Sequence, residues 1–436
     1  MFTSRCTLKP LEPVENERRA TRRRLLAKGL LIGASLAVSS ASMAQAQDPI
    51  KIGLLLTYVG PTAVFARDED RGARLLVDQT NKAGGIGGRQ IELVKYDTEG
   101  KPDRAGSLYR RLAQEDKVSA VIGPDSIFVL LGMSSVPSEM KVMSVAAPGL
   151  YELVQPQFRS YVASAWAPGT FAGTLTLAYL KDKHNVKRIG MLTTADAVGE
   201  RVGKTVQTMA SLFGIEVVSV VAQPASDRDL LPSLNKLANI KPPIDGLYVF
   251  GSGPFANIAM NQAELAGINV PIAYNGGNVV PDLIKEIAPD IAKRTFLVTS
   301  RSTVARTLPK DDKYKAVVDK FSADYQAQYG EPASLPAAVG YDMALAIIDG
   351  LKNVGPDREK LRDYIQTKQR ITGVQGVEFA RTASYGYGID PYDLVIGSIA
   401  NGQFVFSGYV KDSLDRINIK KDQITQKMRD LTMITD

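Results

Sequence analysis

The sequence is poor in the residues that carry most protein catalysis. Its 436 residues include one cysteine, Cys6, and one histidine, His184. Cys6 lies in a predicted N-terminal export signal, so the processed protein has neither a disulfide nor a thiol nucleophile. A single histidine excludes a Cys–His pair and a multi-histidine metal site, and a serine triad would have to use His184. That residue lies in the charged segment LKDKHNVKR, where a solvated or helix-capping role is favoured, so we expect no enzyme, cofactor or metal.

A hydrophobic run long enough to anchor the chain in a membrane is also missing. The basic segment RRATRRRLLAK (18–28) precedes GLLIGASLAVSSASM (29–43), which is too short and too rich in small residues for an anchor. Residues 21–26, TRRRLL, resemble a twin-arginine signal, and an ordinary secretory signal is the alternative. Small residues at 42–44 and 44–46 predict cleavage near Gln47, and no lipid-anchoring cysteine follows. We therefore expect a soluble periplasmic protein that lacks residues 1–46.

Little charge of one sign remains after this cleavage. The removed residues hold eight Lys and Arg and three Asp and Glu, so the net charge falls from +7 to +2. The basic pI of the precursor is therefore no sign of a nucleic-acid partner. With 44% hydrophobic residues, the remaining chain is long enough for two domains with substantial cores.

From residue 50 onward, short aliphatic runs alternate with amphipathic stretches. Strands are predicted at 50–56, 91–97, 118–124, 142–148, 188–194, 215–223, 245–251, 270–275 and 295–300, with helices between them. This alternation predicts an α/β protein with two parallel sheets. Residues 301–384 predict helices near 312–329 and 337–352 but too few strands for a third sheet. Residues 392–410 predict a hairpin that turns at Asn401-Gly402.

Two conspicuous motifs have a structural and a functional interpretation. The glycines of NKAGGIGGRQIELVK (81–95) could form a phosphate loop, but they follow a helix and precede a strand, which is the wrong order. We interpret them as a helix cap and a chain reversal. The acids Asp68, Glu69 and Asp70 could bind a metal, and an acidic first turn of a helix is the favoured interpretation.

The loops after the strands of the first unit are the best place for a ligand, because an open α/β sheet binds ligands at the carboxyl ends of its strands. They are the segments 57–60, 123–128 and 145–149. The second leads into a helix, so Ser126 can cap it, and the amides of Ile127 and Phe128 can hold an anion. Capping alone is the alternative role of Ser126.

These stretches resemble the substrate-binding proteins of branched-chain amino acid ABC transporters. The matching pieces include IKIGLLLTYVGPTA, RGARLLVDQTNKAGGIGGRQIELVKYDTEGKPDRA, VSAVIGP, MSVAAP and AVGYDMALAIIDGL. The resemblance implies a type I periplasmic binding protein: two Rossmann-like lobes with parallel-core sheets, joined by three crossovers, that close on a ligand without catalysis. The first lobe would take 48–166 and 301–384, and the second 167–300 and 385–436. It further implies a monomer that serves an inner-membrane permease with cytoplasmic ATPase subunits.

The resemblance also implies the position of a ligand site, and several residues of this sequence differ there from the family's usual ones. Its expected lining is Tyr58, Ser126, Ile127, Phe128, Ala146, Ala147 and Pro148 in the first lobe, and Val198, Ser252, Phe255, Tyr274 and Gly276 in the second. Pro148 replaces a usual threonine of the carboxylate loop, and Val198 replaces a tyrosine. Ser252-Gly253 replaces an aromatic pair, and Gly276 stands where the family has the acidic residue for an ammonium group.

These departures change the expected ligand. A buried ammonium without a carboxylate partner costs several kcal/mol. An α-amino acid is therefore disfavoured unless Asp125 or Asp196 takes over that role, and a carboxylate with an aromatic or apolar body is favoured. An aliphatic amino acid or amide is the alternative ligand. A sensor that presents its ligand to a receptor, and an exported enzyme with a cofactor, are the alternative functions.

Overall fold

The structure is a computed structural model. It describes residues 48–60, 63–149, 161–167, 169–251, 254–275, 284–381 and 388–433. The chain divides into residues Met1–Gln47 and one compact unit, Asp48–Asp436. The predicted export signal with Cys6 lies outside the described residues, as do the ligand-site candidates Ser252 and Gly276. In the described part, no helix is both long and apolar enough to cross a membrane.

The first sheet is parallel and has the strand order β2-β1-β3-β4-β5. Its strands are β1 (Ile50–Leu56), β2 (Ile91–Asp97), β3 (Ala120–Ile122), β4 (Met143–Ala146) and β5 (Val162–Ser164). The helices between them are α2 (Ala63–Lys82), α3 (Pro102–Gln114), α4 (Ile127–Gly132) and α5 (Val136–Met140). The sequence predicts one helix over 126–140, but the chain breaks there. The second helix begins at Val136 and has Pro137 in its first turn, which suits the fixed φ of proline.

The second sheet has the order β14-β13-β10-β9-β8-β6-β7. Its parallel strands are β6 (Arg188–Thr194), β7 (Glu216–Gln223), β8 (Gly246–Phe250), β9 (Ile272–Asn275) and β10 (Thr295–Thr299). The antiparallel hairpin of β13 (Val395–Ala400) and β14 (Gln403–Tyr409) completes it. Asn401 and Gly402 at the turn have φ angles of 52° and 65°, which confirms the predicted hairpin.

Short and long helices surround this second sheet. They are α7 (Gly169–Ala172), η2 (Gly173–Leu175), α8 (Thr176–His184), α9 (Ala197–Leu212), α10 (Leu231–Ala238), α11 (Pro254–Leu265) and α13 (Pro289–Ala292). His184 ends α8, as its charged segment predicts, and its ring centroid lies 5.1 Å from that of Phe296.

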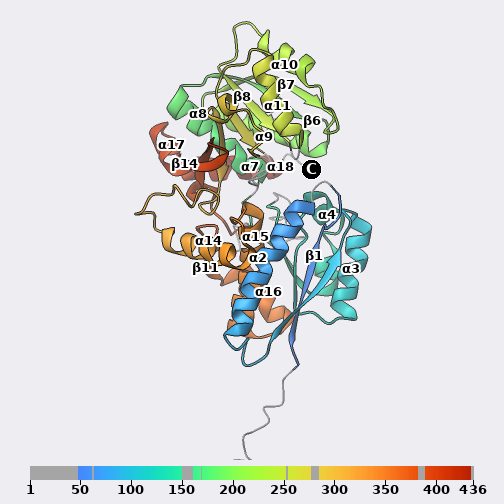
Figure 1. The fold of residues 1–436 in the computed structure, drawn as a ribbon. Helices are drawn as coiled ribbons and strands as arrows, with labels where there is room; N and C mark the ends of the chain where they lie inside the picture. The colour runs from blue at the N-terminus through green and yellow to red at the C-terminus, as the bar shows by residue number, and fades with distance from the viewer. Residues whose placement is uncertain are drawn as a thin grey trace, which may run out of the picture. The chain divides into compact units, whose positions relative to one another are not determined.

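The later part of the chain first returns to the first sheet, where it forms α14 (Lys315–Tyr329), α15 (Leu335–Val354), α16 (Arg358–Thr367), β11 (Arg370–Gly373) and β12 (Val377–Ala380). The last helices are η3 (Pro391–Asp393), α17 (Val410–Arg416) and α18 (Lys421–Met433). They lie with the second sheet, because α17 contacts η3, α8 and β14, and α18 contacts α9. Figure 1 shows α15 beside α2, although the two are far apart in sequence, and α16 packs on α15. The expectation of no third sheet is wrong, because β11 and β12 pair as a two-stranded ribbon. These strands have four residues each, which is too short for a clear periodic pattern.

The glycine segment after α2 is a structural corner. Gly84, Gly85, Gly87 and Gly88 all have positive φ, and a Cβ on Gly85 would lie 2.0 Å from the carbonyl oxygen of Arg89. The side chain of Asn81 exchanges two hydrogen bonds with the backbone of Ile91, at 2.7 and 2.9 Å. The helix cap and reversal are therefore confirmed, and the backbone rather than a phosphate uses these groups.

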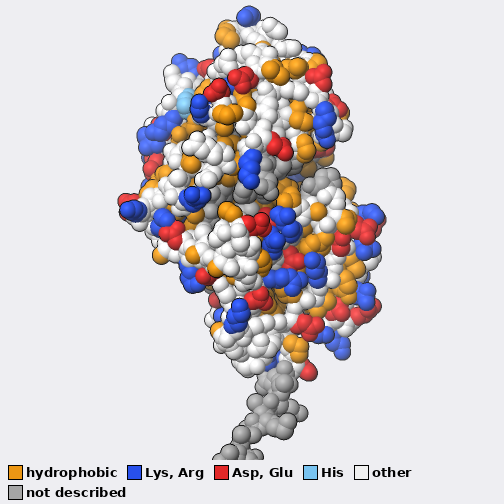
Figure 2. Space-filling view, in the orientation of Figure 1, with side chains coloured by type: hydrophobic (Ala, Val, Ile, Leu, Met, Phe, Trp, Pro, Cys, Tyr) orange, Lys and Arg blue, Asp and Glu red, His pale blue; other side chains and the backbone are white. Residues whose placement is uncertain are grey.

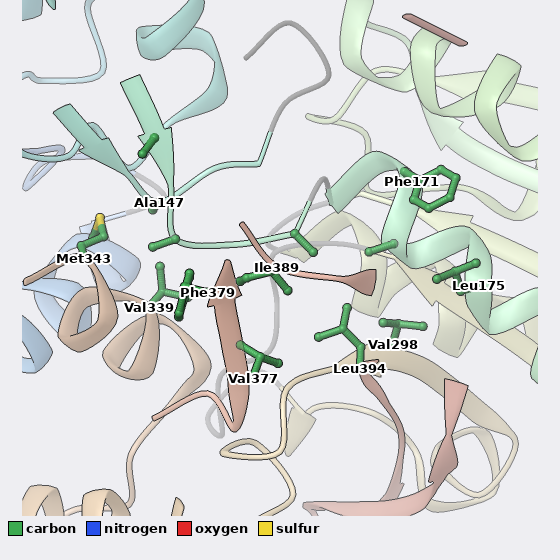
Figure 3. Close-up of a cluster of buried hydrophobic side chains, with 14 of the residues drawn as sticks. Ala147, Phe171, Leu175, Val298, Val339, Met343, Val377, Phe379, Ile389 and Leu394 are labelled. Carbon is green, nitrogen blue, oxygen red and sulfur yellow. The ribbon is translucent and has the colours of Figure 1, made fainter. Parts of the chain in front are cut away.

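One buried hydrophobic cluster continues from the first sheet to the second. It includes Ala147 beside the first sheet, Val298 on β10, and Ile389 and Leu394 from the segment before β13. In Figure 3, Ile389 lies between Phe379 and Leu394. The first sheet uses strands from 48–166, and the second uses strands from 167–300 and 385–436. We call these sheets and their helices the first and second lobe, and their boundaries and three crossovers stay predictions.

Candidate functional site

The loop after β3 arranges the candidate anion donors of the first lobe. The Gly123–Pro124 peptide is cis. Ser126 is the N-cap of α4, and the Ser126 hydroxyl accepts a hydrogen bond from the Val129 amide at 3.4 Å. The capping prediction is therefore confirmed. Ile127 and Phe128 supply the first two amides of the helix, which have no carbonyl acceptor inside it. Because α4 has only six residues, it offers these hydrogen bonds but a weak dipole.

The loop after β4 offers less than the resemblance implies. Ala146 is the last residue of β4 and is fully buried. The Ala147 amide donates to the Pro124 carbonyl at 3.1 Å, and Pro148 has no N–H to donate. The backbone donors of this loop therefore do not support the carboxylate-holding role implied for these three residues.

Tyr58 is held in the wall of the first lobe by polar contacts. Its amide donates to Asp97 at 3.0 Å, its hydroxyl donates to Asp70 at 3.1 Å, and Lys95 Nζ lies 3.5 Å from the centre of its ring. Burial and the neighbouring Asp70 carboxylate raise the pKa of Tyr58 well above its usual range. The hydroxyl therefore stays protonated and fixed on Asp70, which leaves its ring edge as the part able to contact a ligand.

The acidic stretch on α2 differs from the expected first turn. The helix begins at Ala63, so Asp68, Glu69 and Asp70 lie in its second turn, and they are only 5%, 5% and 7% exposed. The first-turn interpretation is wrong because the helix starts further upstream than its apolar face indicates. Asp68 accepts from the Ser334 hydroxyl at 2.7 Å, whereas Glu69 Oε2 has no hydrogen-bond partner. The described residues contain no group of His, Cys, Asp and Glu arranged for a metal.

Glu69 belongs to a buried acidic group at the same edge of the sheet. Asp125 is nearby and accepts hydrogen bonds from the Thr57 amide at 3.1 Å and the Thr57 hydroxyl at 2.9 Å. Burial, reinforced by the charges of Asp125 and Asp68, raises the pKa of Glu69 well above its usual range. Glu69 thus keeps its proton at pH values where an exposed glutamate has lost it, and adds no negative charge to the site there.

This shift predicts how stability changes with pH. Above the ordinary glutamate pKa of about 4.3, the unfolded chain releases a proton that the folded chain retains, so wild-type stability falls as pH rises toward the folded-state pKa of Glu69. Glu69→Gln replaces the titratable carboxyl group by a neutral amide and so removes this pH dependence. We expect the stability of E69Q relative to wild type to increase between pH 4 and pH 8 in chemical denaturation. A difference that stays constant over this range would contradict the raised pKa.

Two apolar side chains stand exposed at this edge of the first lobe. Phe128, on the first turn of α4, is 67% exposed, and Val59, in the loop after β1, is 50% exposed. In the described chain only two other large hydrophobic side chains are exposed, Val220 and Leu265. Two of the four exposed large hydrophobic residues therefore lie in the predicted ligand segments 57–60 and 123–128, whereas a random distribution would scatter them over the surface.

The second-lobe candidates are less accessible. Val198 lies in the first turn of α9 and is partly buried. Phe255 and Tyr274 are 0% and 2% exposed and belong to a core cluster of that lobe. Phe255 lies over Gly251, where an added Cβ would come 2.4 Å from the ring. These two aromatics therefore fill the core in this structure and do not join Phe128 at a surface.

The second lobe also has a cavity of about 460 Å³ that the sequence did not indicate. Its lining comes from the end of β6, one face of α9 and β7: Thr193, Thr194, Ala195, Asp196, Gly199, Glu200, Gly203, Lys204, Gln207, Val220 and Ala222. Asp196 caps α9 by accepting from the Gly199 amide at 2.8 Å. The available signal was the strand–loop–helix pattern of RIGMLTTADAVGE, whose loop is at a strand's carboxyl end.

Comparison with known proteins identifies the family. The model of the family described as "Periplasmic binding protein" matches residues 49–396, so the chain belongs to the periplasmic binding protein family. One relative is the "Leucine-, isoleucine-, valine-, threonine-, and alanine-binding protein" of Pseudomonas aeruginosa. It is 24% identical over 349 residues, which cover 79% of this chain and 90% of the relative.

Solved structures show the same fold. The branched-chain amino acid transporter substrate-binding protein of Streptococcus pneumoniae, in complex with isoleucine, matches 83% of this chain and 99% of its own at 23% identity, with a TM-score of 0.71. A solute-binding protein of an ABC transporter from R. palustris, in complex with benzoate, matches 83% and 96% at 23% identity, with a TM-score of 0.69. The predicted type I periplasmic binding protein fold and the family resemblance are confirmed.

Proposed function

We propose that this chain is the periplasmic substrate-binding protein of an ABC importer and captures a small carboxylate with an aromatic or apolar body. One observation carries the ligand class: Phe128 is 67% exposed on the first turn of α4, beside two amides without helix acceptors. An apolar ring beside free donors suits an aromatic acid. The similar R. palustris protein was solved with benzoate, which supports this class.

An aliphatic amino acid is the second candidate ligand. The Pseudomonas and Streptococcus proteins are named for such ligands. The acidic position expected for the ammonium is Gly276, outside the described residues, but Asp196 is exposed in the cavity of the second lobe. An amino acid would therefore require the carboxylate of Asp196, or that of Asp125 in the first lobe, to bind its ammonium group.

The remaining parts of the proposal follow from the family. We propose export by the N-terminal signal, delivery of the ligand to an inner-membrane permease driven by cytoplasmic ATPase subunits, no catalysis, and a monomeric state. Figure 2 shows Lys and Arg interspersed with Asp and Glu on the face in view. On that face, no continuous basic stripe supports a nucleic-acid partner.

A ligand screen tests the proposal. Purified protein without residues 1–46 would be heated with benzoate, phenylacetate, leucine, isoleucine and valine, because a ligand that binds the folded state raises the melting temperature. We expect the aromatic acids to give the largest shift. Stabilisation by the aliphatic amino acids alone would favour the second candidate. A bound cofactor or turnover in the purified protein would instead indicate an enzyme.

Phe128 permits a test of the site that leaves the fold intact. Because its ring is largely exposed, Phe128→Ala should not change the melting temperature of the free protein. It should weaken benzoate binding about tenfold, since a ring contact of this kind contributes about 1 to 1.5 kcal/mol. Leu265→Ala is the matched control, because Leu265 is 74% exposed at the end of α11. Equal benzoate affinity of both variants in calorimetry would remove Phe128 from the site.

A further inference from the structure

Two positively charged side chains of the described residues are buried, and they differ in their partners. Arg301 and Arg381 are 3% and 2% exposed. Arg301 forms an ion pair with Asp312 at 2.8 Å. Arg381 donates to the Ser164 carbonyl and, at 3.4 Å, to Gln369 Oε1, while its Nε has no partner. None of the carboxylates in the described part of the chain pairs with Arg381.

This leaves a buried charge without an opposite charge. Burial lowers the pKa of Arg381 to about 10, which still leaves the guanidinium charged at neutral pH. Holding a cation away from water costs several kcal/mol unless an anion compensates it. The stack of Arg381 over Phe379, with 5.6 Å between the guanidinium carbon and the ring centre, offsets only part of that cost.

Arg381 is anchored next to the ligand loop of the first lobe. Ser164, whose carbonyl it binds, is the register partner of Ala146 on the neighbouring strand. The loop after Ala146 runs against the segment after Ser164, because a Cβ on Gly149 would lie 2.4 Å from the Trp166 carbonyl oxygen. The guanidinium is thus one strand away from the loop where the resemblance places a ligand carboxylate.

The surrounding contacts fix this arrangement. Gln375 donates to the next carbonyl, that of Ala165, at 2.8 Å, and to Asp342 Oδ2 at 2.9 Å. Gln375 precedes β12 in sequence and Arg381 follows it, and the two side chains bind the consecutive carbonyls of Ala165 and Ser164. A rigidly held donor loses little entropy when it meets an anion, as a specificity residue requires.

We propose that Arg381 is the charge partner of the ligand's carboxylate, so that the protein selects anions over neutral compounds of the same shape. This inference rests on the proposed function, and it supplies what the loops lack. Among the described residues after β4, the Ala147 amide is bonded to the Pro124 carbonyl and Pro148 has no N–H, and α4 is too short for a strong dipole. A carboxylate enclosed there needs a full positive charge, and Arg381 is the buried cation whose charge is not compensated by a described carboxylate.

The test compares benzoate with benzamide, a neutral compound of nearly the same shape, by calorimetry. We expect Arg381→Met to weaken benzoate binding about 30-fold or more and to leave benzamide binding unchanged, because only the anion loses its charge partner. Arg358→Met is the matched control. Arg358 also donates to backbone carbonyls, those of Ala113 and Val118. These carbonyls lie before β3, at the amino-terminal ends of the strands and away from the ligand loops. R358M should leave the ratio of the two affinities unchanged.

Several outcomes overturn the inference. Unchanged benzoate affinity in R381M, or an equal loss for benzoate and benzamide, would show that Arg381 only supports the fold. If R381M does not fold, the neutral polar variant Arg381→Gln replaces it, and an unchanged benzoate-to-benzamide ratio in R381Q overturns the inference too. If wild-type protein binds leucine and no aromatic acid, the proposed ligand class fails by itself. Arg381 is then tested with leucine against leucinamide, with the same expected loss of selectivity.

Discussion

Replacing Gly340 by alanine should lower the free energy of unfolding by about 4 kcal/mol, since overpacking against a rigid backbone is among the largest single-site costs. Gly340 lies on α15 where that helix crosses α2. A Cβ there would be 2.0 Å from the Glu69 carbonyl oxygen, and a Cβ on Gly72 would be 1.9 Å from the Ala337 carbonyl oxygen. The obstacle on both sides is backbone, so the two helices would have to separate. Chemical denaturation measures the loss.

A glycine in an open environment provides the control. Gly106 lies within α3, and an added Cβ would meet Val136 at 3.6 Å, which is ordinary contact. Gly106→Ala should therefore stabilise the protein by about 0.5 to 1 kcal/mol, because alanine loses less backbone entropy in a helix. Similar stabilities of G340A and G106A would show that α2 and α15 are not as tightly packed as described.

The crossing also affects the ligand site. The glycine contact brings Ser334, at the start of α15, within 2.7 Å of Asp68, and Glu69 is enclosed beside it. Loosening α15 would admit water to these acids and relieve the burial that raises the pKa of Glu69. G340A should therefore also weaken the pH dependence of stability that Glu69 produces in the wild type.

Most of the fold was predictable from the sequence, because local chemistry determines it. Residues 50–56 form a strand with the expected limits, since a mainly aliphatic run that ends at the polar Thr57 suits a buried parallel strand. The four glycines after α2 and the Asn401-Gly402 turn adopt positive φ, as their residue types favour. The break between α4 and α5 was missed because the apolar positions continue through it.

The candidate site was harder to predict, because exposure depends on distant parts of the chain. Phe128 and Phe255 are both aromatic residues at the start of a helix, yet one is 67% exposed and the other is fully buried. No local pattern separates them. Likewise, nothing near Arg381 in sequence shows that its charge lacks a carboxylate, since Ser164 and Gln369 become its neighbours only through the fold.

Breaking the ion pair between Arg301 and Asp312 should also cause a large loss of unfolding free energy. Arg301 follows β10, and its Nη1 also donates to the Gly376 carbonyl at 2.8 Å, while its amide donates to the Gln375 carbonyl at 3.0 Å. Asp312 further accepts from the Tyr409 hydroxyl at 3.0 Å. Arg301→Met would leave Asp312 buried without its cation, which should cost about 3 to 5 kcal/mol of unfolding free energy.

A double-mutant cycle separates the ion pair from the packing around it. Asp312→Leu in the R301M background removes the stranded charge, so the double variant should recover much of the stability that R301M loses. Additive losses, with no recovery, would show that the two side chains do not act as a pair.

The pH dependence of the same variants gives an independent check. Burial alone would raise the pKa of Asp312, but hydrogen bonds from Arg301 and the Tyr314 amide outweigh it and leave the pKa below its usual value. The stability that this carboxylate contributes is therefore present above its ordinary pKa of about 4 and is lost as pH falls through the lower folded-state value. The difference between wild type and R301M should shrink over that acidic range. If it stayed constant, the charge on Asp312 would not be the source of the effect, and the stabilisation would come from the contacts of Arg301 with the Gly376 and Gln375 carbonyls instead.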